Sequence, residues 1–395
     1  MNSPIMTRTL TLLILLLSAN GFAQSDKDTT TLSFGAYADG YYSYYTGANE
    51  VAYQQHDAIG AFHNNFGLNI AQMSAAIESD RLRGVLTLHA GDIPSIAWAG
   101  RYRGIQEANT GVRLADRLWL DVGFFKTHVG TESFLPKDNH MSIITLGTFY
   151  GPFYQSGARL SYDTKSEWHF ELHAINGYNL HIDINEYKTF GILASHDFGD
   201  HFGLSYSAMA GQENIGQLRD GYLVYQNAFA NLDYDKVDIQ IGLDVAVANQ
   251  WHASSPTGLM GWLPNPLIAG LAAVKYHFSE SLASTFRAEV FSDESSINST
   301  RRNAEIIANT GESIAIGDWS GMTIYGATIG FEYKPSQNGF LRLESRMLYD
   351  PSAPSSQNPV GYSARQAGMN PMLGNRLQII ATAGFFFDKT FKFAK

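Results

Sequence analysis

The sequence predicts an all-β protein: a transmembrane antiparallel up-and-down β-barrel of about 16 strands, within a range of about 14 to 18. Apolar residues alternate with polar or small ones along many segments, most near the roughly 9–11 residues that a tilted membrane strand needs. The connections are alternately short and long, as expected for short periplasmic turns and long extracellular loops. The 395 residues include 13% aromatics and 37 glycines but only 16% charged residues, and mean hydropathy is slightly negative.

The N-terminal residues predict export. Arg8 precedes an apolar run from Leu10 to Leu17, and Gly21 and Ala23 offer small residues at a cleavage site. This pattern is typical of a signal peptide. The run is shorter than the roughly 20 residues that span a bilayer as a helix. We therefore expect a signal peptide over residues 1–23 and an outer-membrane barrel over residues 24–395.

The clearest strand runs from Lys236 to Gln250. Its odd-numbered positions from 237 to 247 are all apolar, and the even-numbered positions between them are polar or small. Because strand side chains point alternately to opposite faces, one face of this strand is apolar and the other carries polar or small side chains. The same pattern predicts fifteen further strands: Leu32–Tyr45, Phe66–Ser79, Arg81–Gly91, Ile105–Ala115, Arg117–Val129, Ser156–Tyr162, Glu167–Ile175, Tyr187–Phe198, His201–Gly211, Tyr222–Tyr234, Leu267–Phe278, Leu282–Asp293, Met322–Tyr333, Phe340–Tyr349 and Leu377–Phe387.

The lengths of the connections separate a membrane barrel from a soluble β-sandwich. Several turns have only a few residues, such as Ala115–Arg117 and Gly199–His201, and they alternate with longer segments. A sandwich has no reason to keep this alternation for seven hairpins, whereas outer-membrane barrels show it throughout. The long connections are Thr46–Phe62, Asp92–Gly104, Gly130–Gln155, Trp251–Pro266, Glu294–Ser320 and Asp350–Asn375, and those near Tyr178–Asn185 and Gln212–Asp220 are intermediate.

The two faces of the strands predict which side chains meet lipid and which meet the lumen. Ile241, Leu343 and Phe385 lie on the apolar face, which we expect to face lipid. Charged residues lie on the other face. We expect that face to meet water, because an Arg or Lys side chain that faced lipid at mid-membrane would cost about 2–4 kcal/mol. These charges either form structural ion pairs or set a transverse field that filters solutes. The pore-lining candidates are Arg81, Arg83, Glu107, Arg113, Glu171, His173, Asp244, Arg287, Glu289, Arg342, Glu344 and Arg346.

The connection from Gly130 to Gln155 is unusually apolar for a solvated loop, since it includes Phe134, Leu135, Phe149 and Tyr150. A loop that packs on the inside of the barrel would bury these groups. We hypothesise that it folds inward and constricts the pore, and the alternative is a surface loop packed on its neighbours. Its charged candidates for the constriction are Glu132, Lys137, Asp138 and His140.

A stretch in the first half resembles a known family. Residues 105–139 read IQEANTGVRLADRLWLDVGFFKTHVGTESFLPKDN, GPFYQSGARLSY follows from Gly151, and FGAYADGYY opens the first strand. Together they resemble outer-membrane β-barrel porins of the OmpL-like type. The resemblance implies an outer-membrane barrel with a diffusion pore, and it brings no catalytic residues. Barrels of this kind usually end on an aromatic residue, whereas here Phe393 is followed by Ala394 and Lys395. We expect Phe391 or Phe393 to be the recognition point for the barrel-assembly machinery.

Composition limits the ligands and partners. The chain has no cysteine, which excludes disulfides and Cys-ligated metals, and its net charge of −10 argues against nucleic acid. His169, Glu171 and His173 share one strand face, which fits either a metal pair or polar lumen residues. We predict no cofactor. The expected partners are outer-membrane lipid, the assembly machinery and small solutes or ions, and a homo-oligomer is left open.

The sequence therefore predicts a porin-like channel for passive diffusion of small hydrophilic solutes or ions. The alternative is a non-conducting surface barrel that acts as an adhesin or envelope scaffold. An outer-membrane hydrolase is the least favoured interpretation, because no nucleophile motif or Ser–His pairing stands out. The expected location is the outer membrane.

Overall fold

The computed structural model describes residues 29–46, 53–54, 56–98, 100–215, 218–251, 260–299, 321–351 and 375–394. The expected signal peptide, residues 1–23, lies outside these ranges. So do parts of the long connections that follow Tyr45, Trp251, Ser299 and Pro351.

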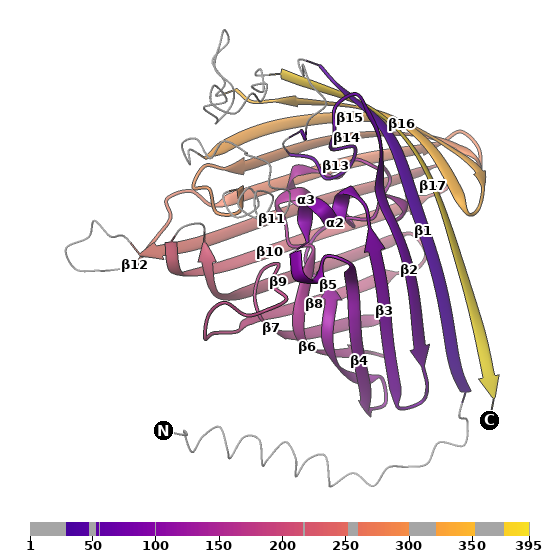
Figure 1. Ribbon diagram of the computed structural model, residues 1–395, viewed down its shortest axis with the longest axis vertical. Coiled ribbons are helices and arrows are strands. Elements are labelled where there is room, and N and C mark those ends of the chain that lie inside the picture. The colour runs from indigo at the N-terminus through magenta and orange to yellow at the C-terminus, as the bar shows by residue number, and fades with distance from the viewer. Residues whose placement is uncertain are drawn as a thin grey trace.

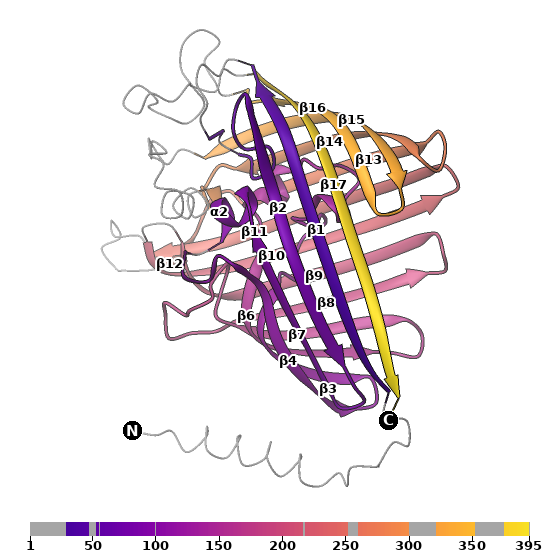
Figure 2. The ribbon, with the colours of Figure 1, turned by 45° about the vertical axis from the view of Figure 1, so that its right-hand side comes forward.

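One antiparallel sheet closes on itself to form the barrel (Figures 1 and 2). The sheet has 17 strands in the described residues. One of them, β12 (Met260–Trp262), pairs only with the C-terminal end of β11, so sixteen strands form the wall. Closure comes from pairing of the first and last strands, from Thr29 opposite Ala394 to Tyr45 opposite Gln378. The wall strands are β1 (Thr29–Tyr45), β2 (Asn65–Glu78), β3 (Leu82–Ala90), β4 (Ile105–Ala115), β5 (Leu118–Lys126), β6 (Tyr154–Asp163), β7 (Trp168–Ile175), β8 (Thr189–Phe198), β9 (Phe202–Ile215), β10 (Leu218–Tyr234), β11 (Val237–Trp251), β13 (Leu267–His277), β14 (Leu282–Asp293), β15 (Met322–Ser336), β16 (Gly339–Tyr349) and β17 (Asn375–Ala394).

The predicted fold class and strand number are confirmed. Each sequence segment with period-2 alternation is a wall strand, and the boundaries differ by a few residues. The largest difference is at the C-terminus, where β17 continues to Ala394 because β1 begins early, at Thr29, and gives it a partner. The short turns lie at one end of the barrel and the long connections at the other (Figure 2).

The distribution of side chains between the two faces is the reverse of that in a soluble protein. Ile241, Leu343 and Phe385 point outward and are 53%, 54% and 59% exposed, respectively. Arg287 and Arg346 are among the largest fully buried side chains, and both lie inside the barrel. A closed barrel satisfies all its backbone hydrogen bonds without an edge, so an apolar outer face suits lipid.

The apolar core lies inside the barrel, and wall strands and inward-folded connections contribute to it about equally. Helices α2 (Asp92–Ala97) and α3 (Leu146–Tyr150) lie within the ring of strands (Figure 1). Two short 3-10 turns, η1 (Gly100–Tyr102) and η2 (Pro136–Asp138), belong to the same two connections. None of the helices among the described residues is long and apolar enough to cross a membrane.

The orientation of the faces can be tested at two neighbouring positions of β11. Ile241→Arg puts a charge on the apolar outer face, where it costs about 2–4 kcal/mol, so we expect the barrel not to assemble stably. Gln240→Arg is the matched control, because Gln240 faces inward and its amide donates to Asn231 Oδ1 at 3.1 Å. Heat-modifiability of the extracted protein on gels reports the folded fraction. Equal behaviour of the two variants would contradict the assignment of faces.

Candidate functional site

The third long connection, residues 127–153 between β5 and β6, is here called loop 3. It folds into the barrel instead of extending from its rim. Phe134, Leu135, Ile143, Phe149 and Phe153 are all buried. The apolar groups that were unusual for a solvated loop thus pack inside the barrel, as hypothesised from the sequence.

Carboxylates of the opposite wall hold the backbone of loop 3. Glu344 on β16 accepts hydrogen bonds from the backbone N–H groups of Ser142 at 2.5 Å and Ile143 at 3.0 Å. Glu289 on β14 accepts one from the N–H of Leu146 at 2.7 Å. Each of these bonds joins residues more than a hundred positions apart. They fasten the loop to one side of the barrel, the wall of β14–β17.

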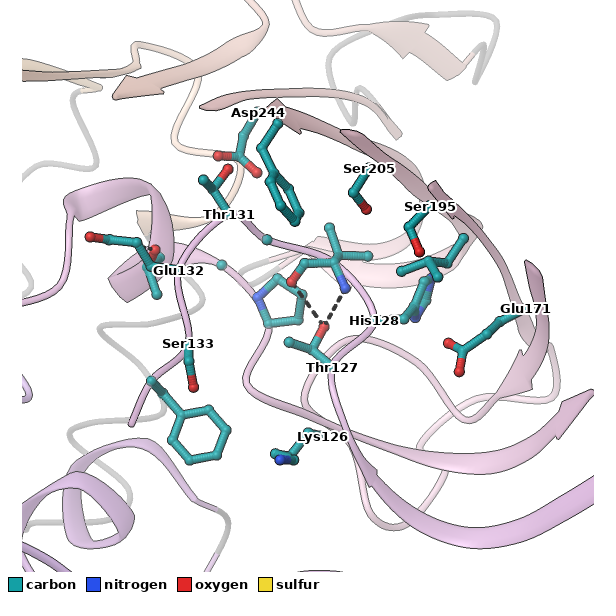
Figure 3. A pocket seen from close by; sticks show the side chains of 18 of the residues that line it. Lys126, Thr127, His128, Thr131, Glu132, Ser133, Glu171, Ser195, Ser205 and Asp244 are labelled. Carbon is teal, nitrogen blue, oxygen red and sulfur yellow. Dashed lines mark hydrogen bonds between the residues drawn. The ribbon is translucent and has the colours of Figure 1, made fainter. Parts of the chain in front are cut away.

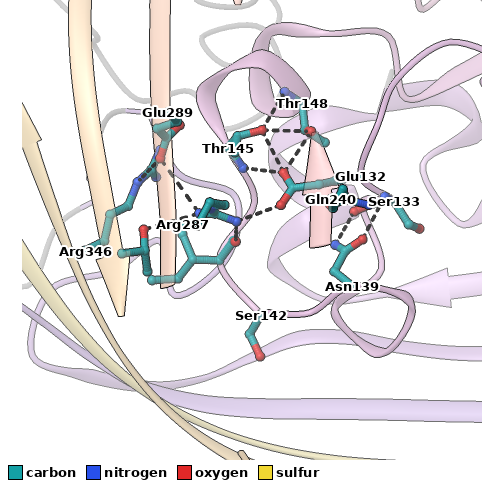
Figure 4. A network of polar contacts seen from close by, with 12 residues as sticks. Glu132, Ser133, Asn139, Ser142, Thr145, Thr148, Gln240, Arg287, Glu289 and Arg346 are labelled. Atoms are coloured by element: carbon teal, nitrogen blue, oxygen red, sulfur yellow. Dashed lines mark hydrogen bonds and ion pairs between the residues drawn. The ribbon is translucent and has the colours of Figure 1, made fainter. Parts of the chain in front are cut away.

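Arginines of the same wall bind loop 3 carbonyls. Arg342 donates to the carbonyls of Pro136 at 2.8 Å and Asn139 at 2.9 Å, and it also pairs with Glu332 at 2.7 Å. Arg287 donates to the carbonyl of Ile143 at 2.6 Å (Figure 4). The guanidinium groups therefore satisfy backbone oxygens that would otherwise be buried without a donor.

Glu132 organises loop 3 internally. Its carboxylate accepts from the N–H and the hydroxyl of Thr145, both at 2.7 Å, from the hydroxyl of Thr148 at 3.1 Å, and from Arg287 at 2.7 Å (Figure 4). Thr145 is in turn the N-cap of α3. One carboxylate thus fixes the start of α3 and joins it to the wall.

The first long connection adds a second clamp on the same wall. Asp57 lies between Arg346 at 3.0 Å and Arg376 at 2.5 Å. Its neighbour His56 contacts the hydroxyl of Tyr150 on α3 through Nδ1. Burial, together with the nearby Arg376 and Arg346, holds the pKa of His56 well below its usual value, so this imidazole is neutral.

An aromatic cluster packs the inward connections against one another. Trp98 stacks on Tyr154 with ring centroids 5.1 Å apart, and Tyr154 stacks on His181 at 4.2 Å. Phe134 of loop 3 meets the Trp98 ring edge-on at 4.9 Å. Because Trp98, Phe134 and Tyr154 are buried, the cluster is core and offers no exposed aromatic surface to a solute.

On the other side of loop 3, the barrel interior is not filled by side chains. A cavity of about 610 Å³ lies between loop 3 and the strands from β4 to β11 (Figure 3). Its lining is polar and charged over much of its surface. The polar and charged lining residues are Glu107, Lys126, Thr127, His128, Thr131, Glu132, Ser133, Thr148, Arg159, His169, Glu171, Ser195, Asp197, Ser205, Asn231 and Asp244.

The pore-lining candidates from the sequence fall into separate groups. Glu107, Glu171 and Asp244 line the cavity. A second group lies on the part of the wall that loop 3 covers, and its members bind loop 3 or one another: Arg287, Glu289, Arg342, Glu344 and Arg346.

The remaining candidates belong to the wall itself. Arg83 pairs with Asp121 at 2.5 Å, and Arg113 lies over the Trp119 ring at 4.8 Å. His173 is buried and stacks on His128, with centroids 3.9 Å apart. Arg81 is exposed and lies in the turn before β3, because that strand begins at Leu82.

The four charged candidates of loop 3 also separate. Glu132 lines the cavity. Lys137 and Asp138 pair with each other at 2.7 Å in η2, the turn that Arg342 holds. His140 follows that turn, and burial, with Lys275 nearby, lowers its pKa. Only Glu132 of the four therefore contacts the cavity, and it does so while bound to Arg287.

The face with His169, Glu171 and His173 is an ion-pair cluster. Glu171 contacts Nε2 of His173 at 2.9 Å, Nε2 of His169 at 3.2 Å and Arg159 at 3.3 Å. Across the part of the chain that the structure describes, no group of three or more His, Asp or Glu side chains is placed to hold a metal ion. The geometry favours the second interpretation, that of polar lumen residues.

Several residues of the site were not among the sequence candidates. Lys126, Arg159 and Asp197 line the cavity, and Asp57 and Arg376 form the first-connection clamp. The parity of β6 could have identified Arg159, which shares a face with the buried Ser161. Asp57 lies in an irregular segment, where no periodicity indicates which way a side chain points.

Comparison with known families and structures agrees with this geometry. The model of the family described as "Putative beta-barrel porin-2, OmpL-like" matches residues 31–387. Among curated protein sequences, none matches the chain.

Solved outer-membrane proteins share the fold. The anion-selective porin from Comamonas acidovorans aligns with a TM-score of 0.56 and 10% identity, over 92% of this chain and all of that one. OmpT of Vibrio cholerae, in its trimer form, aligns with a TM-score of 0.53 and 12% identity, over 91% of this chain and 99% of that one. OprB of Pseudomonas putida aligns with a TM-score of 0.51 and 9% identity, over 97% of each chain. At these identities the likeness is one of fold.

The aromatic cluster predicts an acid-sensitive packing of the inward connections. Burial lowers the pKa of His181 from its usual 6.5 to about 4. An unpacked His181 binds a proton at higher pH than the packed one. The contribution of His181 to this packing is therefore fully present near neutral pH, and it falls by at most roughly 3 kcal/mol as the pH falls from about 6.5 to 4.

Hydrogen-exchange protection of residues 178–182, corrected for intrinsic rates, measures this loss between pH 7 and pH 4.5. His181→Phe is the matched variant, because it keeps an aromatic ring between Tyr154 and Phe124 and cannot be protonated. We expect protection to fall on acidification in the wild type and much less in the variant. An equal fall in both would contradict the assignment to His181.

Proposed function

Because the chain belongs to the OmpL-like beta-barrel porin-2 family, we propose that it is an outer-membrane channel for passive diffusion of small hydrophilic solutes or ions. The observation that carries the proposal is the polar cavity of about 610 Å³ inside a closed barrel. The interior of a 16-stranded barrel is too wide for wall side chains alone to fill. Water and solutes then occupy what the inward connections leave open.

The proposed passage is off-centre. Loop 3 and Asp57 fill the side of β14–β17, where hydrogen bonds and ion pairs hold them. The cavity lies on the other side, along β4–β11. We propose that loop 3 forms one wall of the narrowest part, with Thr131 on the loop side of the cavity and Ser195 and Ser205 on the strand side (Figure 3).

The rival function, a non-conducting adhesin or scaffold, would use surface loops to bind partners. The inward folding of loop 3 supports the channel instead, since a loop buried on the barrel wall offers nothing to a partner outside. We propose no catalytic role. We further propose that the termini and short turns face the periplasm, that residues 1–23 are the export signal, and that the assembly machinery inserts the barrel.

Association of copies is a separate proposal. The OmpT neighbour is described in a trimer form. We propose that this chain also forms a homo-oligomer in the membrane, through part of its apolar outer wall. Its solutes would then pass through each barrel separately, because the passage lies inside one chain.

The channel and the role of loop 3 are testable together in planar bilayers. Deleting residues 136–143 removes the part of loop 3 that Arg342 and Glu344 hold. The deletion variant also carries Arg342→Gln and Glu344→Gln, because both charges lose their hydrogen-bond partners in loop 3. Glu332, the other partner of Arg342, keeps Lys275 at 2.7 Å. We expect single-channel conductance to rise roughly twofold, because the open cross-section of the barrel widens.

The control is the full-length chain with the same two substitutions. There the amide nitrogen at position 342 can still donate to loop 3 carbonyls, and the amide oxygen at position 344 can still accept from loop 3 N–H groups. Its conductance should stay near the wild-type value. A wild-type chain that assembles but passes no current would overturn the channel and favour the scaffold. Equal conductance in the deletion variant and its control would place loop 3 outside the path.

A further inference from the structure

The distribution of unpaired charge in the cavity points to the kind of solute that passes. This inference rests on the proposed channel. The cationic side chains beneath loop 3 are covered and each is bound to a carboxylate: Arg287 to Glu132 at 2.7 Å, Arg342 to Glu332 at 2.7 Å and Arg346 to Glu289 at 2.8 Å. They are buried on the side of the barrel that loop 3 closes, so a solute in the cavity does not contact them.

The two cationic side chains that line the cavity, lysine and arginine counted, are also paired. Lys126 lies 3.8 Å from Glu107. Arg159 lies 3.3 Å from both Asp121 and Glu171. Lining carboxylates therefore neutralise the lining bases.

Two lining carboxylates remain without a cation. Within the described residues, no Lys, Arg or His nitrogen lies within 4.0 Å of Asp197 or Asp244, although both line the cavity. Asp244 accepts instead from the amide of Asn227 at 2.9 Å. The surplus charge facing the cavity is thus negative.

The surroundings of Asp244 add oxygen atoms. The amide nitrogen of Asn227 donates both to Asp244 and to the hydroxyl of Thr131 at 3.0 Å. The amide oxygen of Asn227 is buried and has no hydrogen-bond partner among the described residues. Carboxylate, amide and hydroxyl oxygens together are the donors that hard cations accept as ligands.

We infer that the passage prefers cations over anions and that Asp244 is the main determinant of this preference, with Asp197 as the second. A cation that passes loop 3 meets the Asp244 carboxylate with Asn227 and Thr131 beside it. An anion meets the same carboxylate without a free base to offset it. Rings and clusters of carboxylates give cation selectivity in other channels by this same electrostatic route.

Reversal potentials across a KCl gradient in planar bilayers test the inference on the full chain. Asp244→Asn keeps the shape of the side chain and removes its charge. We expect the wild type to be more permeable to K⁺ than to Cl⁻. In the variant the K⁺/Cl⁻ permeability ratio should fall at least about twofold, because one unit charge within a few ångströms changes local ion populations by that much. Asp197→Asn combined with Asp244→Asn should lose more.

Asp116→Asn is the matched control, since Asp116 lies in the β4–β5 turn with its side chain 83% exposed. Its permeability ratio should equal that of the wild type. A wild type that favours Cl⁻ or shows no preference would overturn the inference, as would an unchanged ratio in Asp244→Asn. Absence of current from an assembled barrel would instead overturn the proposed function, so the two failures can be told apart.

Discussion

Buried charge is the constraint on which the interior of this barrel depends. Arg287, Arg342 and Arg346 project from the wall into a space that loop 3 closes off from water. A buried ion left without its partner costs about 3–5 kcal/mol, so each must be paired and hydrogen-bonded. Wall carboxylates supply the pairing and loop 3 supplies carbonyls and N–H groups. The loop and the wall charges therefore hold each other in place.

This arrangement makes the interior asymmetric. Polar side chains on β14–β17 form hydrogen bonds and ion pairs with the loops that pack on them, whereas polar side chains on β4–β11 face a cavity. A rigid loop wall is useful to a diffusion channel, because the width of the passage then does not depend on a fluctuating segment. The unpaired carboxylates Asp244 and Asp197 lie on the open side, where they can act on solutes.

The fold was predictable because it follows from local rules. The period-2 pattern of a strand such as β11 defines both the strand and its lipid face, and alternating short and long connections define the barrel. The apolar content of loop 3 also indicated that it packs inside. The partners across the interior were not predictable: Arg346 and Asp57 lie far apart in sequence, and no periodicity applies to the first connection. Arg81 was expected to begin a strand, but β3 begins one residue later and Arg81 lies in the turn before it.

The width of the proposed passage depends most directly on where loop 3 lies. The hydroxyls of Ser142 on loop 3 and Thr382 on β17 are 2.8 Å apart, and the chain has no cysteine. Introducing Ser142→Cys and Thr382→Cys together gives a single pair of thiols at this contact. We expect oxidation in the assembled barrel to form the cross-link, visible as a mobility shift that reductant reverses, and to leave single-channel conductance unchanged. Failure to cross-link, or a cross-link that changes the conductance, would contradict this position of loop 3.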